Sequence, residues 1–180
     1  MQRDQIGVEV TLHHEPTHPG LNPDRAWTGL LGIGAAGSLA LLLLGSYVHN
    51  LYVSGWPLVG DTMFPDLSNR FVAVHYLHRA LAAVGFVYLV YLAIDATRRE
   101  RPEMERLLIN AAAAAYLLNI VLGAAHVFTE VGSSALVAGH LVVASLVWAL
   151  LVGVTMIARS GPPTIAAADG ESELVRAPPA

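Results

Sequence analysis

The sequence contains no cysteine, and all ten of its basic residues are arginine. The absence of cysteine excludes disulfides, zinc–thiolate sites, iron–sulfur clusters and thiol nucleophiles, so any metal or cofactor must be held by histidine or carboxylate. The formal net charge of −4 leaves no basic stripe that would neutralise a run of phosphates. We therefore expect no nucleic-acid partner.

Charged residues are also scarce. They make up 13% of the 180 residues, hydrophobic residues make up 54%, and the mean hydropathy is +0.53. Because a water-soluble domain has about 25% charged residues, this composition indicates a membrane protein. Crossing a hydrocarbon core about 30 Å thick takes roughly 20 helical residues. Four stretches meet this requirement: Ala26–Val48, Phe71–Ile94, Leu107–Phe128 and Ser134–Ile157.

These stretches predict an all-α fold, an integral membrane four-helix bundle over residues 26–158. The first stretch is long enough to span a bilayer, so we expect it to be retained rather than removed as a signal peptide. A polar leader, residues 1–25, precedes the bundle. The tail, residues 159–180, combines proline and glycine with small and charged residues, which predicts disorder.

The arginines indicate how the bundle is oriented. Those that flank one side of the predicted helices are Arg25, Arg98, Arg99, Arg101, Arg106 and Arg159. The loops on the other side, 49–70 and 129–133, hold only Arg70. Because cytoplasmic flanks are enriched in arginine, we expect both termini, with the leader and the tail, to be cytoplasmic. We therefore predict a multi-pass protein of the cell membrane whose helix bundle contacts the membrane lipids.

Histidines are concentrated toward one side of the predicted bundle. Five of the eight fall in or beside the apolar stretches: His49, His75, His78, His126 and His140. At about 1.5 Å of rise per residue, His78 lies about 10 Å below Phe71, and His140 about 9 Å below Ser134. Ionisable groups within membrane spans usually face the bundle interior and mark functional sites. The histidines therefore predict a polar layer in the outer half of the bundle.

Two neutral imidazoles at equal depth on parallel helices can supply both axial ligands of a heme iron. His78 and His140 meet this requirement. Arg79, next to His78, can give a heme propionate a charge-assisted hydrogen-bond partner. His75 and His126 lie nearer the outer surface and are further candidates for the same site.

The same residues allow other interpretations. A histidine in a membrane helix can simply hydrogen-bond to a neighbouring helix, and Arg79 can extend toward the interface or pair with Glu130. Glu130 and Asp61 could form a proton relay with the histidines. A copper site would use His49, His75 and His126.

The leader carries a separate histidine cluster, His13, His14 and His18, which could bind a transition metal. Pro16 interrupts this cluster, and no further ligands follow at a fixed spacing. A solvated, mobile segment is the alternative interpretation.

Four short motifs follow one another between Gly45 and Ala144. They are Gly55-Trp56-Pro57 with Gly60 and Pro65, His75-x-x-His78-Arg79, Asn119-x-x-Leu122-Gly123, and His140-Leu141 followed by Ala144. In order and spacing they resemble the heme A synthase family, membrane enzymes of cytochrome oxidase biogenesis built from two similar four-helix halves. The corresponding family motifs are a Trp-Pro loop, Glu-x-x-His-Arg, Gln-x-x-Leu-Gly and His-Leu.

The resemblance implies an activity and a ligand set. The family oxidises the methyl group of heme O to the formyl group of heme A by two hydroxylations and loss of water. One half of such an enzyme holds a heme b cofactor and the other half the substrate heme, each through a histidine pair. Carried over to this chain, His78 and His140 would be the heme ligands, and Arg79 would be the propionate or structural partner.

This chain departs from the family pattern in three ways. It corresponds to one four-helix half, so a homo-oligomer would be needed to supply two heme sites. His75 stands where the family has a glutamate that is considered important for catalysis, and His75, His126 or Glu130 would have to replace that acid. The loop cysteine pair of many members is absent.

Three hypotheses follow from the sequence. The first is an enzyme of the heme A synthase type that works as a homo-oligomer, with His75 as its catalytic candidate. The second is a heme b protein for electron transfer or heme handling that performs no oxidation, which the exchange of glutamate for His75 favours. The third is an accessory subunit of a respiratory complex. Partners in the respiratory chain or in heme biosynthesis are expected in each case.

Overall fold

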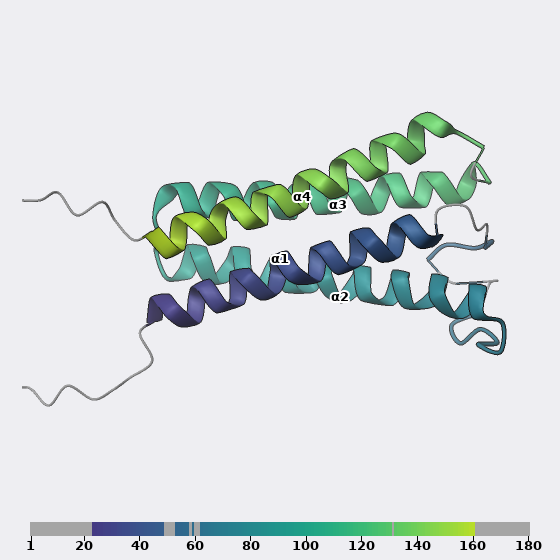
Figure 1. The fold of residues 1–180 in the computed structure, drawn as a ribbon, viewed down its shortest axis with the longest axis horizontal. Coiled ribbons are helices and arrows are strands. Elements are labelled where there is room, and N and C mark those ends of the chain that lie inside the picture. Colours follow the sequence, from purple (N-terminus) through teal and green to yellow (C-terminus); the bar gives the residue numbers. More distant parts are fainter. Residues whose placement is uncertain (1–22, 49–52, 58, 60–61, 131, 161–180) are drawn as a thin grey trace, which may run out of the picture.

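The computed structural model describes residues 23–48, 53–57, 59, 62–130 and 132–160. Four long helices make up most of this part of the chain (Figure 1). They are α1 (Pro23–Val48), α2 (Arg70–Arg98), α3 (Glu103–Phe128) and α4 (Ser134–Ser160). Each is long and apolar enough to cross a membrane. The predicted all-α bundle of four membrane helices is confirmed.

The helices extend beyond the predicted apolar stretches, mainly on one side of the bundle. The sequence prediction began the third helix at Leu107, but α3 begins at Glu103, directly after Pro102. Glu103 and Glu105 lie in its first turn, where acidic side chains interact favourably with the helix dipole. α2 continues past Ile94 to Arg98. This last turn contains polar residues, and a prediction from hydropathy leaves them out.

The other two helices also extend past the predicted apolar stretches. α1 includes residues 23–25 of the leader, and proline is favoured at a first helical position such as Pro23. α4 runs on to Ser160, whose hydroxyl donates to the carbonyl of Met156. The rest of the leader, with its histidine cluster, and the predicted disordered tail lie outside the described residues, as do His49 and Asp61.

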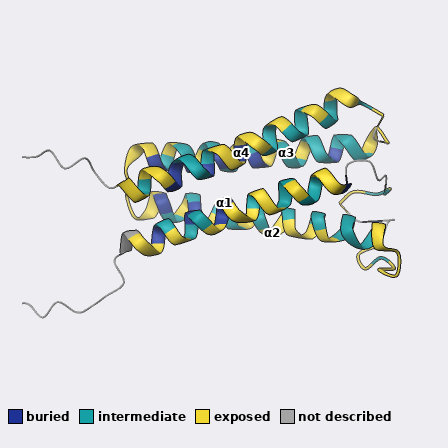
Figure 2. Ribbon diagram, in the orientation of Figure 1, coloured by how far each residue is buried: buried dark blue, intermediate teal, exposed yellow. Residues whose placement is uncertain are grey.

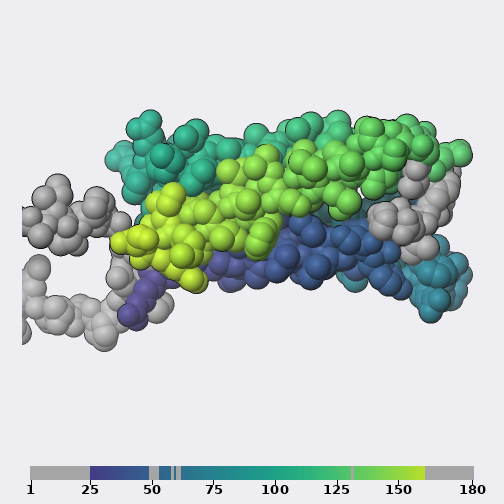
Figure 3. Space-filling model, turned by 45° about the horizontal axis from the view of Figure 1, so that its top comes forward, coloured from purple at the N-terminus to yellow at the C-terminus, as the bar shows by residue number. Residues whose placement is uncertain are grey.

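The helices run alternately up and down, and each contacts two neighbours. The packed pairs are α1 with α2, α2 with α3, α3 with α4, and α4 with α1. The space-filling view shows α1 and α4 side by side along the bundle (Figure 3). α2 and α4 are therefore diagonally opposite across the interior, and they point in the same direction.

One end of the bundle, here called the terminal end, holds Pro23, Ser160 and the connection from α2 to α3 (Figure 1). The opposite end, called the loop end, holds the connections from α1 to α2 and from α3 to α4. The two termini of the helical bundle thus lie on the same side, as the sequence predicts. The arginine flanks also gather at the terminal end, whereas Arg70 lies at the loop end.

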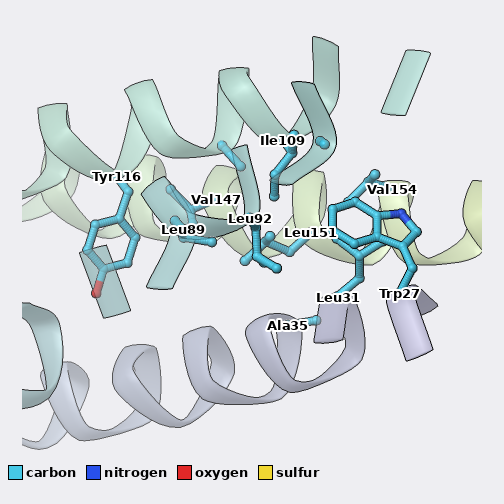
Figure 4. Packing of buried hydrophobic residues seen from close by; sticks show 12 residues of the cluster. Trp27, Leu31, Ala35, Leu89, Leu92, Ile109, Tyr116, Val147, Leu151 and Val154 are labelled. Atoms are coloured by element: carbon cyan, nitrogen blue, oxygen red, sulfur yellow. The ribbon is translucent and has the colours of Figure 1, made fainter. Parts of the chain in front are cut away.

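Close side-chain packing is concentrated toward the terminal end (Figures 2 and 4). Figure 4 shows Trp27 at one end of this core and Tyr116 at the other. The buried cluster consists of Trp27, Leu31, Ala35, Leu89, Leu92, Ala96, Ile109, Ala112, Tyr116, Val147, Leu151 and Val154. Every helix contributes to this core, so the core holds the four helices together toward the terminal end.

Two tyrosine hydroxyls tie neighbouring helices together. The Tyr88 hydroxyl on α2 donates to the carbonyl of Leu30 on α1 at 2.8 Å. The Tyr116 hydroxyl on α3 donates to the carbonyl of Ala82 on α2 at 3.0 Å. A Cβ atom at Gly85 would lie 2.6 Å from the Tyr116 hydroxyl oxygen, so a larger residue there would displace the Tyr116 side chain or the helix. Such interhelical hydrogen bonds set the rotation of membrane helices about their axes.

A third hydrogen bond reaches across the bundle diagonal at the terminal end. The indole Nε1 of Trp27 on α1 donates to Oε2 of Glu105 on α3 at 2.8 Å. Both side chains are buried, with Trp27 only 2% and Glu105 only 7% exposed. The guanidinium of Arg101 lies 5.0 Å from the centre of the Trp27 ring. A buried carboxylate needs a polar partner, and the Trp27 indole provides one for Glu105. The contact also joins α1 and α3, which do not otherwise pack together.

Candidate functional site

The loop-end half of the bundle encloses a cavity of about 440 Å³. All four helices contribute to its wall. Four of the histidines singled out in the sequence line it: His75, His78, His126 and His140. The predicted polar layer is thus one internal cavity, of a size typical of cofactor and small-molecule sites.

His140 extends into this cavity from the second turn of α4, and its orientation is fixed by α3. Its Nδ1 atom lies 3.0 Å from the backbone carbonyl oxygen of Asn119. A carbonyl oxygen only accepts hydrogen bonds, so Nδ1 carries the proton and donates it to that contact. Nε2 is therefore left with its lone pair, which is the atom and the tautomer that metal ligation uses.

His78 enters the cavity from α2, diagonally opposite α4. Its Nδ1 atom is buried and makes no hydrogen bond to any described residue. Buried polar atoms without a partner are rare in folded proteins and often mark a site that binds something further. The imidazole of His78 is therefore positioned on the cavity wall with unused hydrogen-bonding or ligating capacity.

Each of these two imidazoles rests against a glycine of the preceding helix. A Cβ atom at Gly45 on α1 would lie 3.1 Å from Cε1 of His78. A Cβ atom at Gly123 on α3 would lie 3.2 Å from Cε1 of His140. Both distances are closer than ordinary van der Waals contact, so a larger residue would press on the ring. The same glycine–histidine arrangement is thus built twice, on opposite sides of the cavity.

His75 and His126 line the same cavity from adjacent helices, α2 and α3. His75 lies one turn nearer the loop end than His78, and His126 lies in the last turn of α3. Among the residues that the structure describes, no group of three or more histidine, aspartate or glutamate side chains is arranged to hold a metal ion. The copper alternative also requires His49, which lies outside that set, so it stays a prediction.

Of the two carboxylates proposed for a proton relay, the structure describes only Glu130. Glu130 is exposed in the connection between α3 and α4 and does not line the cavity. Asp61 lies outside the described residues. The structure therefore brings the histidines together without Glu130.

Arg79 binds the connection between α1 and α2. Its two terminal guanidinium nitrogens donate to the carbonyl oxygens of Gly55, at 2.6 Å, and Val53, at 3.0 Å. Gly55 has a φ of 84°, a left-handed backbone conformation that side chains other than glycine rarely adopt. The predicted contact of Arg79 with a heme propionate stays a prediction, and the structure shows Arg79 hydrogen-bonded to the backbone of residues 53–57.

Sequence reasoning missed the residues that act on the site through their backbone. Asn119 was noted only as a motif position, yet its carbonyl orients His140, and its side-chain Oδ1 is buried on the cavity wall without a hydrogen bond from a described residue. Residues 53–57 were noted only for the Trp-Pro pair, yet their carbonyl oxygens at Val53 and Gly55 accept hydrogen bonds from Arg79. No side-chain pattern reveals a backbone acceptor, so neither contact had a sequence signal.

Comparison with known families agrees with this arrangement of motifs. Residues 8–152 of the 180-residue chain match COX15-CtaA, a family of cytochrome oxidase assembly proteins. The chain belongs to this family. The match covers α1, α2, α3 and most of α4, and therefore all four cavity histidines. This family is the one that contains heme A synthase, so the resemblance predicted from the sequence motifs is confirmed.

Two further comparisons return no match. No curated protein and no solved structure matches the COX15-CtaA chain. With four helices able to cross a membrane and membership of this family, the chain is a membrane protein with a role in cytochrome oxidase assembly.

Proposed function

We propose that this COX15-CtaA protein binds heme in the loop-end cavity, with His78 and His140 as the axial ligands, and acts in the conversion of heme O to heme A. The observation that carries the proposal is the placement of these two histidines on diagonally opposite helices of one cavity, with His140 held in the ligating tautomer by Asn119. Two imidazoles from opposite sides are what a six-coordinate heme iron takes from a helix bundle.

Three features of the cavity support a heme as its ligand. The Nδ1 contact of His140 with a backbone carbonyl is the usual outer-shell support of a metal-bound imidazole. Gly45 and Gly123 allow the rings of His78 and His140 to lie directly against the neighbouring helices. Most of the remaining wall is apolar, for example Leu41, Ile120 and Leu141, as a largely hydrophobic macrocycle requires.

The proposed reaction converts one methyl group of heme O to a formyl group. In each of two hydroxylations, an oxidant from outside the chain accepts two electrons and an external oxygen source supplies the atom that converts a C–H bond to C–OH. Loss of water from the resulting carbon with two hydroxyl groups leaves the aldehyde. A heme cofactor, when bound, would supply the redox chemistry. The contribution of the chain itself is to orient the hemes through His78 and His140 and to offer His75 as the titratable group one turn nearer the loop end.

His75 also favours a second candidate function. The heme A synthase motif has a glutamate at this position, and an imidazole cannot provide the negative charge that a carboxylate gives toward a cationic intermediate. A heme b protein that transfers electrons or handles heme, without oxidising it, needs only the axial ligands. An accessory role in a respiratory complex would need neither the ligands nor His75.

The assembly and placement of the protein follow from the same reasoning. The described residues of one chain form one such histidine cavity. We propose that a homo-oligomer, at least a homodimer, supplies two heme sites. The arginine-rich terminal end would face the cytoplasm, which places the histidine cavity in the outer half of the cell membrane. Enzymes of heme biosynthesis and respiratory-chain subunits are the proposed partners.

The experiment that separates these functions is identification of the bound heme. The protein is purified from membranes that make hemes b and O, and the extracted hemes are identified by chromatography and mass. Heme A, or a hydroxylated heme O, found together with heme b supports the enzyme. Heme b alone supports the heme-binding protein without oxidation, and an absence of heme contradicts both. The mass of the protein–detergent complex tests the oligomer, which a strict monomer would contradict.

A further inference from the structure

A short segment of chain at the loop end lines the cavity and is bound by one half-buried arginine. Residues 53–57 contribute Val53, Trp56 and Pro57 to the cavity wall. They have no helix or strand of their own to fix them. Their position must therefore be set by contacts to the helices.

Arg79 provides such contacts. It lies directly after His78 on α2, and its guanidinium donates to two carbonyl oxygens of the segment, at Gly55 and Val53. A planar guanidinium that binds two acceptors at once fixes direction as well as distance. The side chain is half-buried beneath the segment, where hydrogen bonds of a charged donor are stronger than in water.

The position of the Gly55 carbonyl, which accepts one of these hydrogen bonds, is also fixed. Gly55 presents its carbonyl to Arg79 from a backbone with φ of 84°. A residue with a Cβ atom at this position would be strained in that conformation and would turn the carbonyl away from Arg79. The contact therefore depends on both the guanidinium of Arg79 and the backbone conformation of Gly55.

We infer that Arg79 is a positioning residue that holds residues 53–57 as a cover over the histidine cavity and so excludes the aqueous phase at the loop end from the space between His78 and His140. The inference concerns the cavity on which the proposed function rests, but it does not depend on what the cavity binds. It predicts that breaking the contact between Arg79 and Gly55 admits water-soluble reagents to the cavity without unfolding the helices.

The cysteine-free sequence allows a direct test. Ser38 lines the cavity from α1, seven residues before Gly45 and therefore about 10 Å further from the loop end. A Ser38→Cys variant of the full chain carries one thiol at that depth with almost no change of shape. The packed core blocks approach from the terminal end. The rate of modification by a positively charged, membrane-impermeant methanethiosulfonate therefore reports entry from the loop end.

The rate is measured in lipid nanodiscs, where both ends of the bundle face solvent. Ser38→Cys should react slowly, and adding Arg79→Gln should raise the rate at least tenfold. Gly55→Ala should also raise the labelling rate, because this substitution disturbs the acceptor without changing α2. Arg79→Lys should restore part of the protection, since an ammonium group can still donate to one carbonyl.

Two controls make the readout specific. Arg70→Gln removes an arginine from the loop end of the same helix, where Arg70 lies over the ring of Phe71 rather than on the cover, and should leave the rate within twofold. A thiol at exposed Ser134, introduced as Ser134→Cys, should react at one rate in every background. Thermal unfolding and the heme spectrum of each variant are recorded, so that loss of cover, loss of fold and loss of heme are read separately.

The outcomes decide the inference. Faster labelling in both Arg79→Gln and Gly55→Ala, with unchanged unfolding temperature, supports it. Labelling rates in the two variants equal to that of Ser38→Cys alone would overturn it, as would an equal increase in Arg70→Gln. If Arg79→Gln fails to fold, Gly55→Ala decides alone. Neither result depends on whether heme is found, so the proposed function stands or falls by its own experiment.

Discussion

The Nδ1 atom of His140 donates to the backbone carbonyl of Asn119, 3.0 Å away on the neighbouring helix. This contact does three things at once. It satisfies one ring nitrogen inside a membrane bundle, it selects the tautomer whose Nε2 is available for ligation, and it fixes the ring against Gly123. Because the acceptor belongs to the backbone, the arrangement depends on the packing distance between α3 and α4.

That dependence gives a prediction for Gly123. In Gly123→Ala the new Cβ atom would lie 3.2 Å from Cε1 of His140, so the ring or the helix must shift. Overpacking of this kind costs about 1–3 kcal/mol of stability. We expect Gly123→Ala to lower the unfolding temperature in detergent and to change the absorption spectrum of bound heme. Gly45→Ala should act in the same way through His78, 3.1 Å away.

Two other glycines provide matched controls. Gly37 on α1 and Gly139 on α4 have open space where a Cβ atom would be placed. Replacing a helical glycine by alanine without a clash gains about 0.5–1 kcal/mol. Gly37→Ala and Gly139→Ala should therefore raise the unfolding temperature slightly and leave the heme spectrum unchanged. If all four variants behaved alike, the two glycine–histidine contacts would have no special role.

The buried pair at the terminal end should matter for stability alone. Trp27→Phe keeps an aromatic ring but removes the indole N–H, from which Glu105 accepts a hydrogen bond at 2.8 Å. A buried carboxylate that loses this partner costs about 1–3 kcal/mol. We expect a clear fall in the unfolding temperature with an unchanged heme spectrum, because Trp27 lies in the packed core and not on the cavity wall.

The control for this substitution is Trp148→Phe on α4, where the indole is 37% exposed. It makes the same chemical change at the surface of the bundle and should have a much smaller effect on the unfolding temperature. Equal effects of the two substitutions would mean that the contact between Trp27 and Glu105 does not stabilise the bundle.

His75 separates the two candidate functions. His75→Glu restores the acid of the heme A synthase motif on a side chain that already lines the cavity. If the proposed enzyme is limited by this position, the variant should form more formyl or hydroxylated product from supplied heme O than the unmodified protein does. His75→Gln, of the same shape as glutamate but uncharged, is the control. No difference between the two variants would favour a heme-binding role without oxidation.

Much of the fold could be predicted from the sequence because bilayer thickness and hydropathy together constrain it. Each of the four helices was found within a few residues. The errors lie at ends such as Glu103 and Arg98, where polar residues continue a helix that hydropathy ends early. Helix dipoles and the position of Pro102 decide these ends, and an apolar window does not register them.

The site could be predicted only in part. The depth of His78 and His140 follows from the rise of a helix, so their shared level was predictable, and the resemblance to the family added the pairing. The contacts of Asn119 and Arg79 were not predictable, because both involve backbone carbonyls whose positions depend on helix rotation and on the path of residues 53–57. Packing sets that rotation, and one sequence does not reveal it.

The most direct test of the account is the absorption spectrum of purified protein in which one histidine at a time is replaced. His78→Ala and His140→Ala should each abolish or strongly shift the low-spin heme spectrum, because each removes one of two axial ligands. Asn110→Ala, on the exposed surface of α3, is the control and should leave the spectrum unchanged. A wild-type low-spin spectrum in either histidine variant would contradict the assignment of His78 and His140 as the heme ligands.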